Sequence, residues 1–198
     1  PVGSICVYAH TAVNVIVDVA GYVPASSDYV ALTPARLLDT RPTPVAAGKF
    51  VEVPVAGRGG VSADAEAVVA NVTVVGASVP GFVTVFPCGT RPGTSSVNYL
   101  AGEAVANEVI AKLSPVGSIC VYAHTAVNVI VDVAGYVPAS SDFVGLTPVR
   151  LADTRPPWVA ADGLFTATGP VLATKTIEIP IADRGGVPAD AKAVVANV

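Results

Sequence analysis

Hydrophobic and polar positions alternate with a period of two along several parts of this chain. Between 13 and 19, valine occupies each odd position, while Asn14, Ile16 and Asp18 occupy the even ones. Such alternation is typical of a β-strand that buries one face. Together with clusters of β-branched residues, it predicts strands at 13–19, 49–55, 67–75, 82–88, 95–100, 105–113, 118–123 and 127–133.

No long stretch has an apolar face at helical spacing. The segment 31–41 could form one short helical turn, but Pro34 limits any helix there. Segments rich in Gly and Pro, including the RGGV runs at 58–61 and 184–187, are expected to be turns. About eight short strands in roughly 110 residues predict an all-β fold, a two-sheet β-sandwich or jelly roll, with a closed barrel as the alternative.

The sequence repeats itself. PVGSICVYAHTAVNVIVDVAGYVPASSD stands at 1–28 and again at 115–142, an offset of 114 residues (115 − 1). AVVANV at 67–72 returns at 193–198, an offset of 126 (198 − 72), so the later copy carries a 12-residue insertion (126 − 114) around 157–174. The offset suits one small globular domain, and stalks, fibres and surface arrays are built from such tandem copies.

We therefore expect 29–142 to be one complete repeat module. On this interpretation 1–28 is the C-terminal part of a preceding repeat, 143–198 is the N-terminal part of the following one, and PASSD forms a hinge between them. The incomplete parts would take strands from a neighbouring chain, or neighbouring repeats would exchange strands.

The amino-acid composition narrows the class of protein to which this chain can belong. The chain is 52% hydrophobic and 13% charged, with a net charge of −4 and no Met. No basic stripe favours nucleic acid or an anionic membrane, and no apolar run is long enough to predict a membrane span. Few Lys and Glu residues suit an extracellular protein.

The three cysteines are Cys6, Cys88 and Cys120. Cys6 and Cys120 are one position in successive repeats, so Cys88 and Cys120 are the only pair within a module. We expect them to form a disulfide in an oxidising compartment, with two buried free thiols as the alternative. Cys6 is expected to be unpaired because its repeat is truncated. No CxxC or His pair indicates zinc.

An Arg-Asp-Arg constellation occurs in each copy, as Arg36, Asp39 and Arg41 and as Arg150, Asp153 and Arg155. Guanidinium groups suit bidentate pairing with carboxylates. We expect each set to be a clamp that fixes the module junction, with binding of an acidic ligand as the alternative.

No set of residues indicates catalysis. His10 and His124 are the only histidines, and no Ser or Asp is placed by sequence to complete a triad with either. Asp18 and Asp132 interrupt apolar strands, where such residues usually form hydrogen bonds to the backbone, and no DxDxDG-like cluster indicates calcium. We expect no enzyme activity, no metal and no cofactor.

The ordered motifs LTPARLLDTRP, VAGRGGVSADAEAVVANVTVV, GFVTVFPCGT, SSVNYLAGE, ANEVIAKL, GSICVY and VNVIVDVAGYV span essentially the whole chain. This series resembles a repeat module of secreted and cell-surface proteins of actinobacteria and similar bacteria. The resemblance implies a non-catalytic, β-rich extracellular domain without a well-defined ligand. Cys88 and Cys120 match the cysteine pair of that module.

Two functions remain. The first is a structural repeat of an extracellular or cell-surface fibre, stalk or filament, whose partners are neighbouring repeats or copies of itself joined head to tail. Sandwiches laid end to end would repeat at roughly 35–45 Å. The second is an adhesion module for polysaccharide or cell wall, for which Trp158 and Phe165 in the insertion form the best ligand loop, and Tyr99, Tyr8 and Tyr122 are further aromatic candidates.

Overall fold

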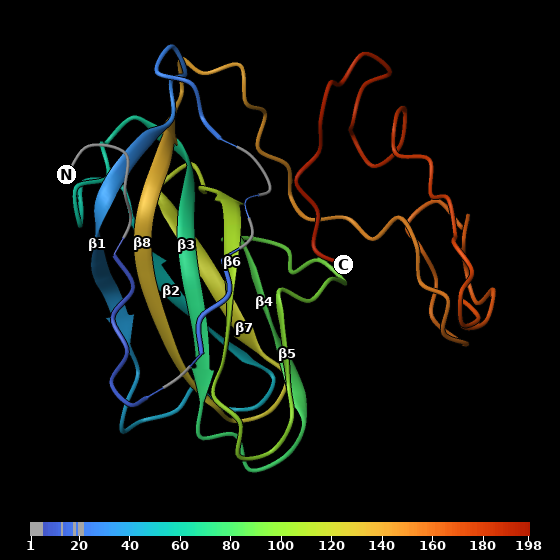
Figure 1. Cartoon of the computed structure of the whole chain (residues 1–198), viewed down its shortest axis with the longest axis horizontal. Helices are drawn as coiled ribbons and strands as arrows, with labels where there is room; N and C mark the ends of the chain where they lie inside the picture. The colour runs from blue at the N-terminus through green and yellow to red at the C-terminus, as the bar shows by residue number, and fades with distance from the viewer. Residues whose placement is uncertain (1–5, 13, 18, 20–21) are drawn as a thin grey trace.

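The computed structural model describes residues 6–12, 14–17, 19 and 22–198. Eight strands form within the predicted complete repeat (Figure 1). They are β1 (Val30–Asp39), β2 (Lys49–Pro54), β3 (Ala65–Val75), β4 (Gly81–Pro87), β5 (Val97–Tyr99), β6 (Val105–Lys112), β7 (Ser118–Ala123) and β8 (Asn128–Pro138).

The strands build two antiparallel sheets, in the orders β1-β8-β3-β6 and β2-β7-β4-β5. Apart from the β4–β5 hairpin, each strand is followed by one in the opposite sheet, which is the connectivity of a jelly roll. The prediction of an all-β sandwich is therefore confirmed. Valines at the odd positions from Val127 to Val133 are fully buried between the sheets, as the alternation predicts.

Most of 31–41, where the sequence predicts no strand, belongs to β1. This strand lies at the edge of its sheet. Its register against β8 shifts between Ala31 and Ala35, and Pro34 lies in that irregular stretch. Proline is tolerated there because an edge strand has one side without a hydrogen-bonding partner. The sequence pattern missed β1 because its exposed and half-buried residues do not alternate cleanly.

The two linkers of the repeat contain the PASSD sequences at 24–28 and 138–142. Both meet the sandwich at the same end. Val30 begins β1 opposite Tyr136, and Pro138 ends β8 opposite Ala65. We call this end the junction pole. The opposite end, the far pole, carries the connections β1–β2, β3–β4, β5–β6 and β7–β8.

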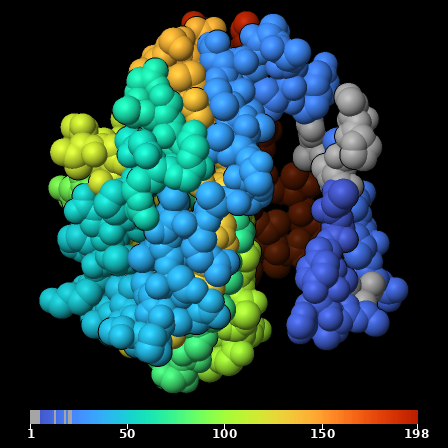
Figure 2. Space-filling view, turned by 90° about the vertical axis from the view of Figure 1, so that its left-hand side faces the viewer, coloured from blue at the N-terminus to red at the C-terminus, as the bar shows by residue number. Residues whose placement is uncertain are grey.

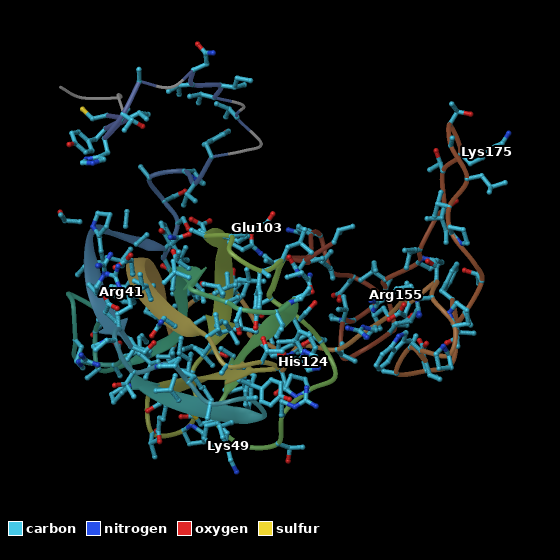
Figure 3. The ribbon with its side chains drawn as sticks, turned by 90° about the horizontal axis from the view of Figure 1, so that it is seen from below. Arg41, Lys49, Glu103, His124, Arg155 and Lys175 are labelled. Atoms are coloured by element: carbon cyan, nitrogen blue, oxygen red, sulfur yellow. A yellow bond between two sulfur atoms is a disulfide. The ribbon has the colours of Figure 1, made fainter. Side chains whose placement is uncertain are left out.

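The flanking parts form no strands within the described residues. The strand predicted at 13–19 is absent from 14–17 and 19, while 13 and 18 lie outside the described residues. The AVVANV copy at 193–198 is likewise not a strand. In the complete repeat, the same sequences form β8 and β3, which obtain their backbone hydrogen bonds from neighbouring strands. Figure 2 shows most of the N-terminal part lying beside the sandwich, and Figure 3 shows both flanking parts outside it.

Candidate functional site

The first predicted clamp joins the first and last strands of the repeat. Arg36 on β1 faces Asp132 on β8 in register, and its Nε and Nη2 donate to the two carboxylate oxygens at 2.8 and 3.1 Å. Arg36 also lies 3.6 Å from Asp39. The partner Asp132 was not part of the predicted constellation, and its pairing with a guanidinium differs from the backbone role expected of it.

Asp39 and Arg41 form a second ion pair at the far pole, where Figure 3 labels Arg41. The Asp39 carboxylate accepts from the Arg41 side chain at 2.9 Å and from its backbone N–H at 3.1 Å. These bonds hold the pKa of Asp39 at about 2. Both ion pairs lie within one repeat, so a role at the junction between repeats stays a prediction.

The later copy rebuilds the same local structure. Arg155 donates to Asp153 from its backbone N–H at 3.1 Å and from Nε at 2.9 Å, and hydrogen bonding to Arg155 lowers the pKa of Asp153 to about 2. Arg150, the counterpart of Arg36, donates to Asp153 at 3.0 Å. The Asp153 side chain is only 4% exposed.

The RGGV turns also match between copies. Arg58 donates to the carbonyl oxygens of Pro54 at 2.7 Å and Leu37 at 3.0 Å, which ties β2 to β1 across the two sheets. Arg184 donates to the equivalent carbonyls of Pro180 and Leu151. RGGV at 58–61 is therefore a turn, as predicted, and its arginine joins β1 and β2.

The two linkers meet over a groove at the junction pole. This groove, of about 360 Å³, is bounded by Tyr29 and Phe143 and floored by Val69, Ile110 and Val137. Burial and the nearby Glu108 carboxylate raise the pKa of Tyr29.

Each PASSD sequence is an ordered turn. Ser27 and Ser141 donate their N–H groups to Pro24 and Pro138, and each serine hydroxyl accepts from the residue two positions later at 3.2 Å.

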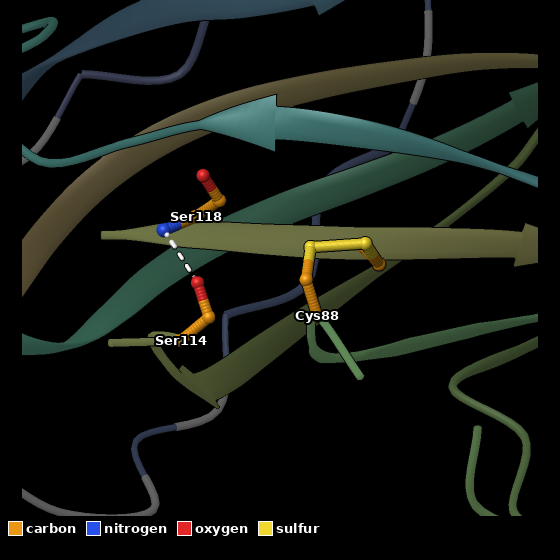
Figure 4. The surroundings of a disulfide bond; sticks show 4 residues. Cys88, Ser114 and Ser118 are labelled. Atoms are coloured by element: carbon orange, nitrogen blue, oxygen red, sulfur yellow. Dashed lines mark hydrogen bonds between the residues drawn. A yellow bond between two sulfur atoms is a disulfide. The ribbon is translucent and has the colours of Figure 1, made fainter. Parts of the chain in front are cut away.

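The predicted disulfide between Cys88 and Cys120 is present, with 4.9 Å between the two Cα atoms (Figure 4). It anchors the connection after β4 on the outer face of the β2-β7-β4-β5 sheet. Thr84 donates to the Thr94 carbonyl at 2.5 Å, and the Ser96 hydroxyl accepts from Val85 N–H at 2.9 Å. The loop thereby covers the strand beneath it.

The same face carries a cluster of aromatic rings that the sequence does not predict as a group. Phe82 stacks on His124 with 4.7 Å between ring centroids, and it lies 6.2 Å from Tyr122. Arg91, from the disulfide-anchored loop, lies 4.4 Å from the Tyr122 ring. Alternation within 82–88 could have placed Phe82 on the outer face. Only the loop conformation brings Arg91 there.

The other aromatic candidates differ in accessibility. Tyr99 is buried, and its hydroxyl lies 2.9 Å from that of Thr125, so it offers no surface for a ligand. Trp158 is 55% exposed with Arg155 over its ring, and Phe165 lies under Arg184. Tyr8 is exposed. Cys6 is exposed and free.

A scan of family models and searches of curated proteins and solved structures found no match to this chain. Within the described residues, no group of three or more His, Cys, Asp or Glu side chains is arranged to hold a metal ion. No helix in that part of the chain is long and apolar enough to cross a membrane. Fold and site together define the class of protein, a disulfide-bonded jelly-roll β-sandwich whose two linkers leave from one pole.

Proposed function

We propose that this chain is a non-enzymatic structural repeat of an extracellular or cell-surface fibre, stalk or filament. The observation that carries the proposal is that copies of parts of the sandwich's sequence lie on both sides of the complete sandwich, and that both linkers form the same hydrogen-bonded turn. A joint of this kind would hold successive modules in one repeating relation, which supports the proposal. The disulfide supports an oxidising, extracellular location.

The test is electron microscopy of four copies of 29–142 joined in series under oxidising conditions. All eight strands of this unit pair with one another, so the unit can fold alone. We expect evenly spaced particles in a row and no retention on cell-wall polysaccharide. Irregular spacing together with retention on polysaccharide would favour the second function.

That second function, polysaccharide adhesion, is favoured by the aromatic cluster rather than by the insertion alone. Phe82, Tyr122 and His124 present rings on one face beside Arg91, and aromatic rings are common platforms for sugars. Phe82→Ala should abolish retention on polysaccharide if this face binds it, whereas deletion of 157–168 should abolish it if Trp158 does. Neither change should matter to a purely structural repeat.

A further inference from the structure

The insertion of the later copy bonds to the segment that corresponds to the end of β1. Asp153 donates its N–H to the Phe165 carbonyl at 3.0 Å and accepts from Ala167 N–H at 2.8 Å, as in a bridge between parallel strands. Ala161 N–H donates to the Arg150 carbonyl at 2.8 Å. The insertion thereby supplies backbone partners to a segment that has the sequence of an edge strand.

The pairing of β1 with β8 shows which side of the edge strand these backbone groups face. Thr40 donates its N–H to the Val129 carbonyl at 3.0 Å, so the backbone N–H of Thr40 points towards β8. Successive residues of an antiparallel strand direct their backbone groups to opposite sides, so the N–H and C=O of Asp39 point to the open edge of the sheet. Asp153 is the counterpart of Asp39. The insertion therefore lies on the outer side of its segment, away from the side that faces β8.

A carboxylate of the insertion also pairs with the arginine of the second RGGV turn. Asp162 accepts from Arg184 Nε at 2.7 Å and from Nη2 at 3.1 Å. The same guanidinium lies over the Phe165 ring, 5.4 Å from its centroid. The Arg184 side chain is only 9% exposed, so the insertion covers a guanidinium as well as a backbone edge.

The complete repeat has the same edge and the same arginine without an insertion. Arg58 donates from Nη1 and Nη2 to the carbonyls of Pro54 and Leu37, as its counterpart does in the later copy. Within the described residues, however, Arg58 pairs with no carboxylate, and its Nε has no acceptor. The Asp39 side chain is 26% exposed, against 4% for Asp153. The complete repeat thus leaves open what the insertion covers in the later copy.

We propose that the outer edge of β1, together with Arg58, is a docking site for a peptide segment that carries an acidic residue and an aromatic residue three positions later. The backbone of this segment bonds to the N–H and C=O of Asp39, its carboxylate pairs with Arg58, and its ring lies under the same guanidinium. Asp162 and Phe165 have this spacing in the insertion. Addition of a peptide to an open sheet edge, with side chains that set specificity, is a common mode of recognition. The site is additional to the structural function, and a repeat that carries the insertion closes it.

The insertion itself supplies the probe. Trp158 is the only tryptophan of the chain, so its fluorescence in a synthetic peptide of residues 157–170 reports binding to the tryptophan-free unit 29–142. We expect the anisotropy of the peptide to rise on titration with this unit and to saturate at one peptide per repeat. In the peptide, Asp162→Asn should weaken binding about tenfold, because it removes the charge from the hydrogen bonds to the arginine. Val159→Asn is the matched control, at a position that is 64% exposed in the insertion, and should leave the affinity unchanged.

Amide hydrogen exchange, followed by NMR, locates the peptide on the repeat. The Asp39 amide points to the open edge and should exchange more slowly in the complex. The Thr40 amide already donates to Val129, so its exchange should be the same with and without the peptide.

Three results would each overturn the proposal: no rise in anisotropy, an equal affinity of the Asp162→Asn peptide, or unchanged exchange at Asp39 in the complex. Protection of the Asp39 amide in the unit alone at high concentration would also overturn it, because a second copy would then occupy the edge. None of these results bears on the structural function, which is tested by microscopy of joined repeats.

Discussion

At the scale of single residues, the Asp39 carboxylate makes the stability of the repeat depend on pH. Its folded-state pKa of about 2 lies below the ordinary value of 3.8, because Arg41 donates to the charged form. A depressed pKa contributes stability that is complete above the ordinary pKa and is lost as the pH falls through the folded one. We expect the melting temperatures of the wild-type protein and Asp39→Asn to differ at pH 6 and to converge towards pH 2.

Asp64→Asn is the matched control, since Asp64 is exposed and its side chain has no ion pair among the described residues. Its melting temperature should follow that of the wild-type protein throughout the titration. A constant difference between wild type and Asp39→Asn down to pH 2 would show that the carboxylate charge is not what stabilises the strand end.

The sequence identified Arg36, Asp39 and Arg41 as a paired set but not how the pairs form. Asp39 and Arg41 are two positions apart, so their contact follows from local geometry. Arg36 meets Asp132, 96 positions away, through the register of β1 against β8. That register contains shifts around Pro34, which no periodic pattern reveals.

At the scale of elements, the disulfide fixes the loop after β4 against β7. The double substitution Cys88→Ser/Cys120→Ser should lower the free energy of unfolding by about 3–4 kcal/mol on the loop-entropy model, measured by urea denaturation. Cys6→Ser is the matched control and should change nothing, because Cys6 is exposed and outside the sandwich. A loss no larger than that of the control would contradict the stabilising role.

Alternation predicted the strands that bury one face, β4 among them, but not where the opposite face of a strand is also covered. β8 alternates because its valines face the core. On β4, Thr84 and Phe86 are also buried, although they face away from the core, because the disulfide-anchored loop and Phe50 cover them. PASSD reads as a hinge in the sequence, yet its serine hydroxyls close a hydrogen-bonded turn. Tertiary contacts of this kind leave no periodic signal.

At the scale of the whole molecule, the shared pole changes the expected shape of an array. Six residue steps separate Pro138 from the start of the next β1 sequence at Val144, a reach of about 20 Å. The sandwich is about 35 Å tall, given the length of its longest strands. The linker is therefore too short to lead to the opposite end, so we expect successive repeats to meet at one pole rather than in the end-to-end arrangement predicted from sequence. We predict that successive repeats are joined at their junction poles, with their far poles turned outward.

This arrangement can be measured on two copies of 29–142 joined in series, with Cys88–Cys120 intact in each. Spin labels at Ala63 of both copies mark the junction poles, and labels at Ala47 of both copies mark the far poles. We expect the Ala63 pair to be much closer than the Ala47 pair, whose separation can approach two sandwich heights, or about 70 Å. In an end-to-end stack, both pairs would instead be separated by one sandwich height. Equal distances would therefore contradict the shared-pole geometry, and a short Ala63 distance would place every repeat of a longer array along a common spine.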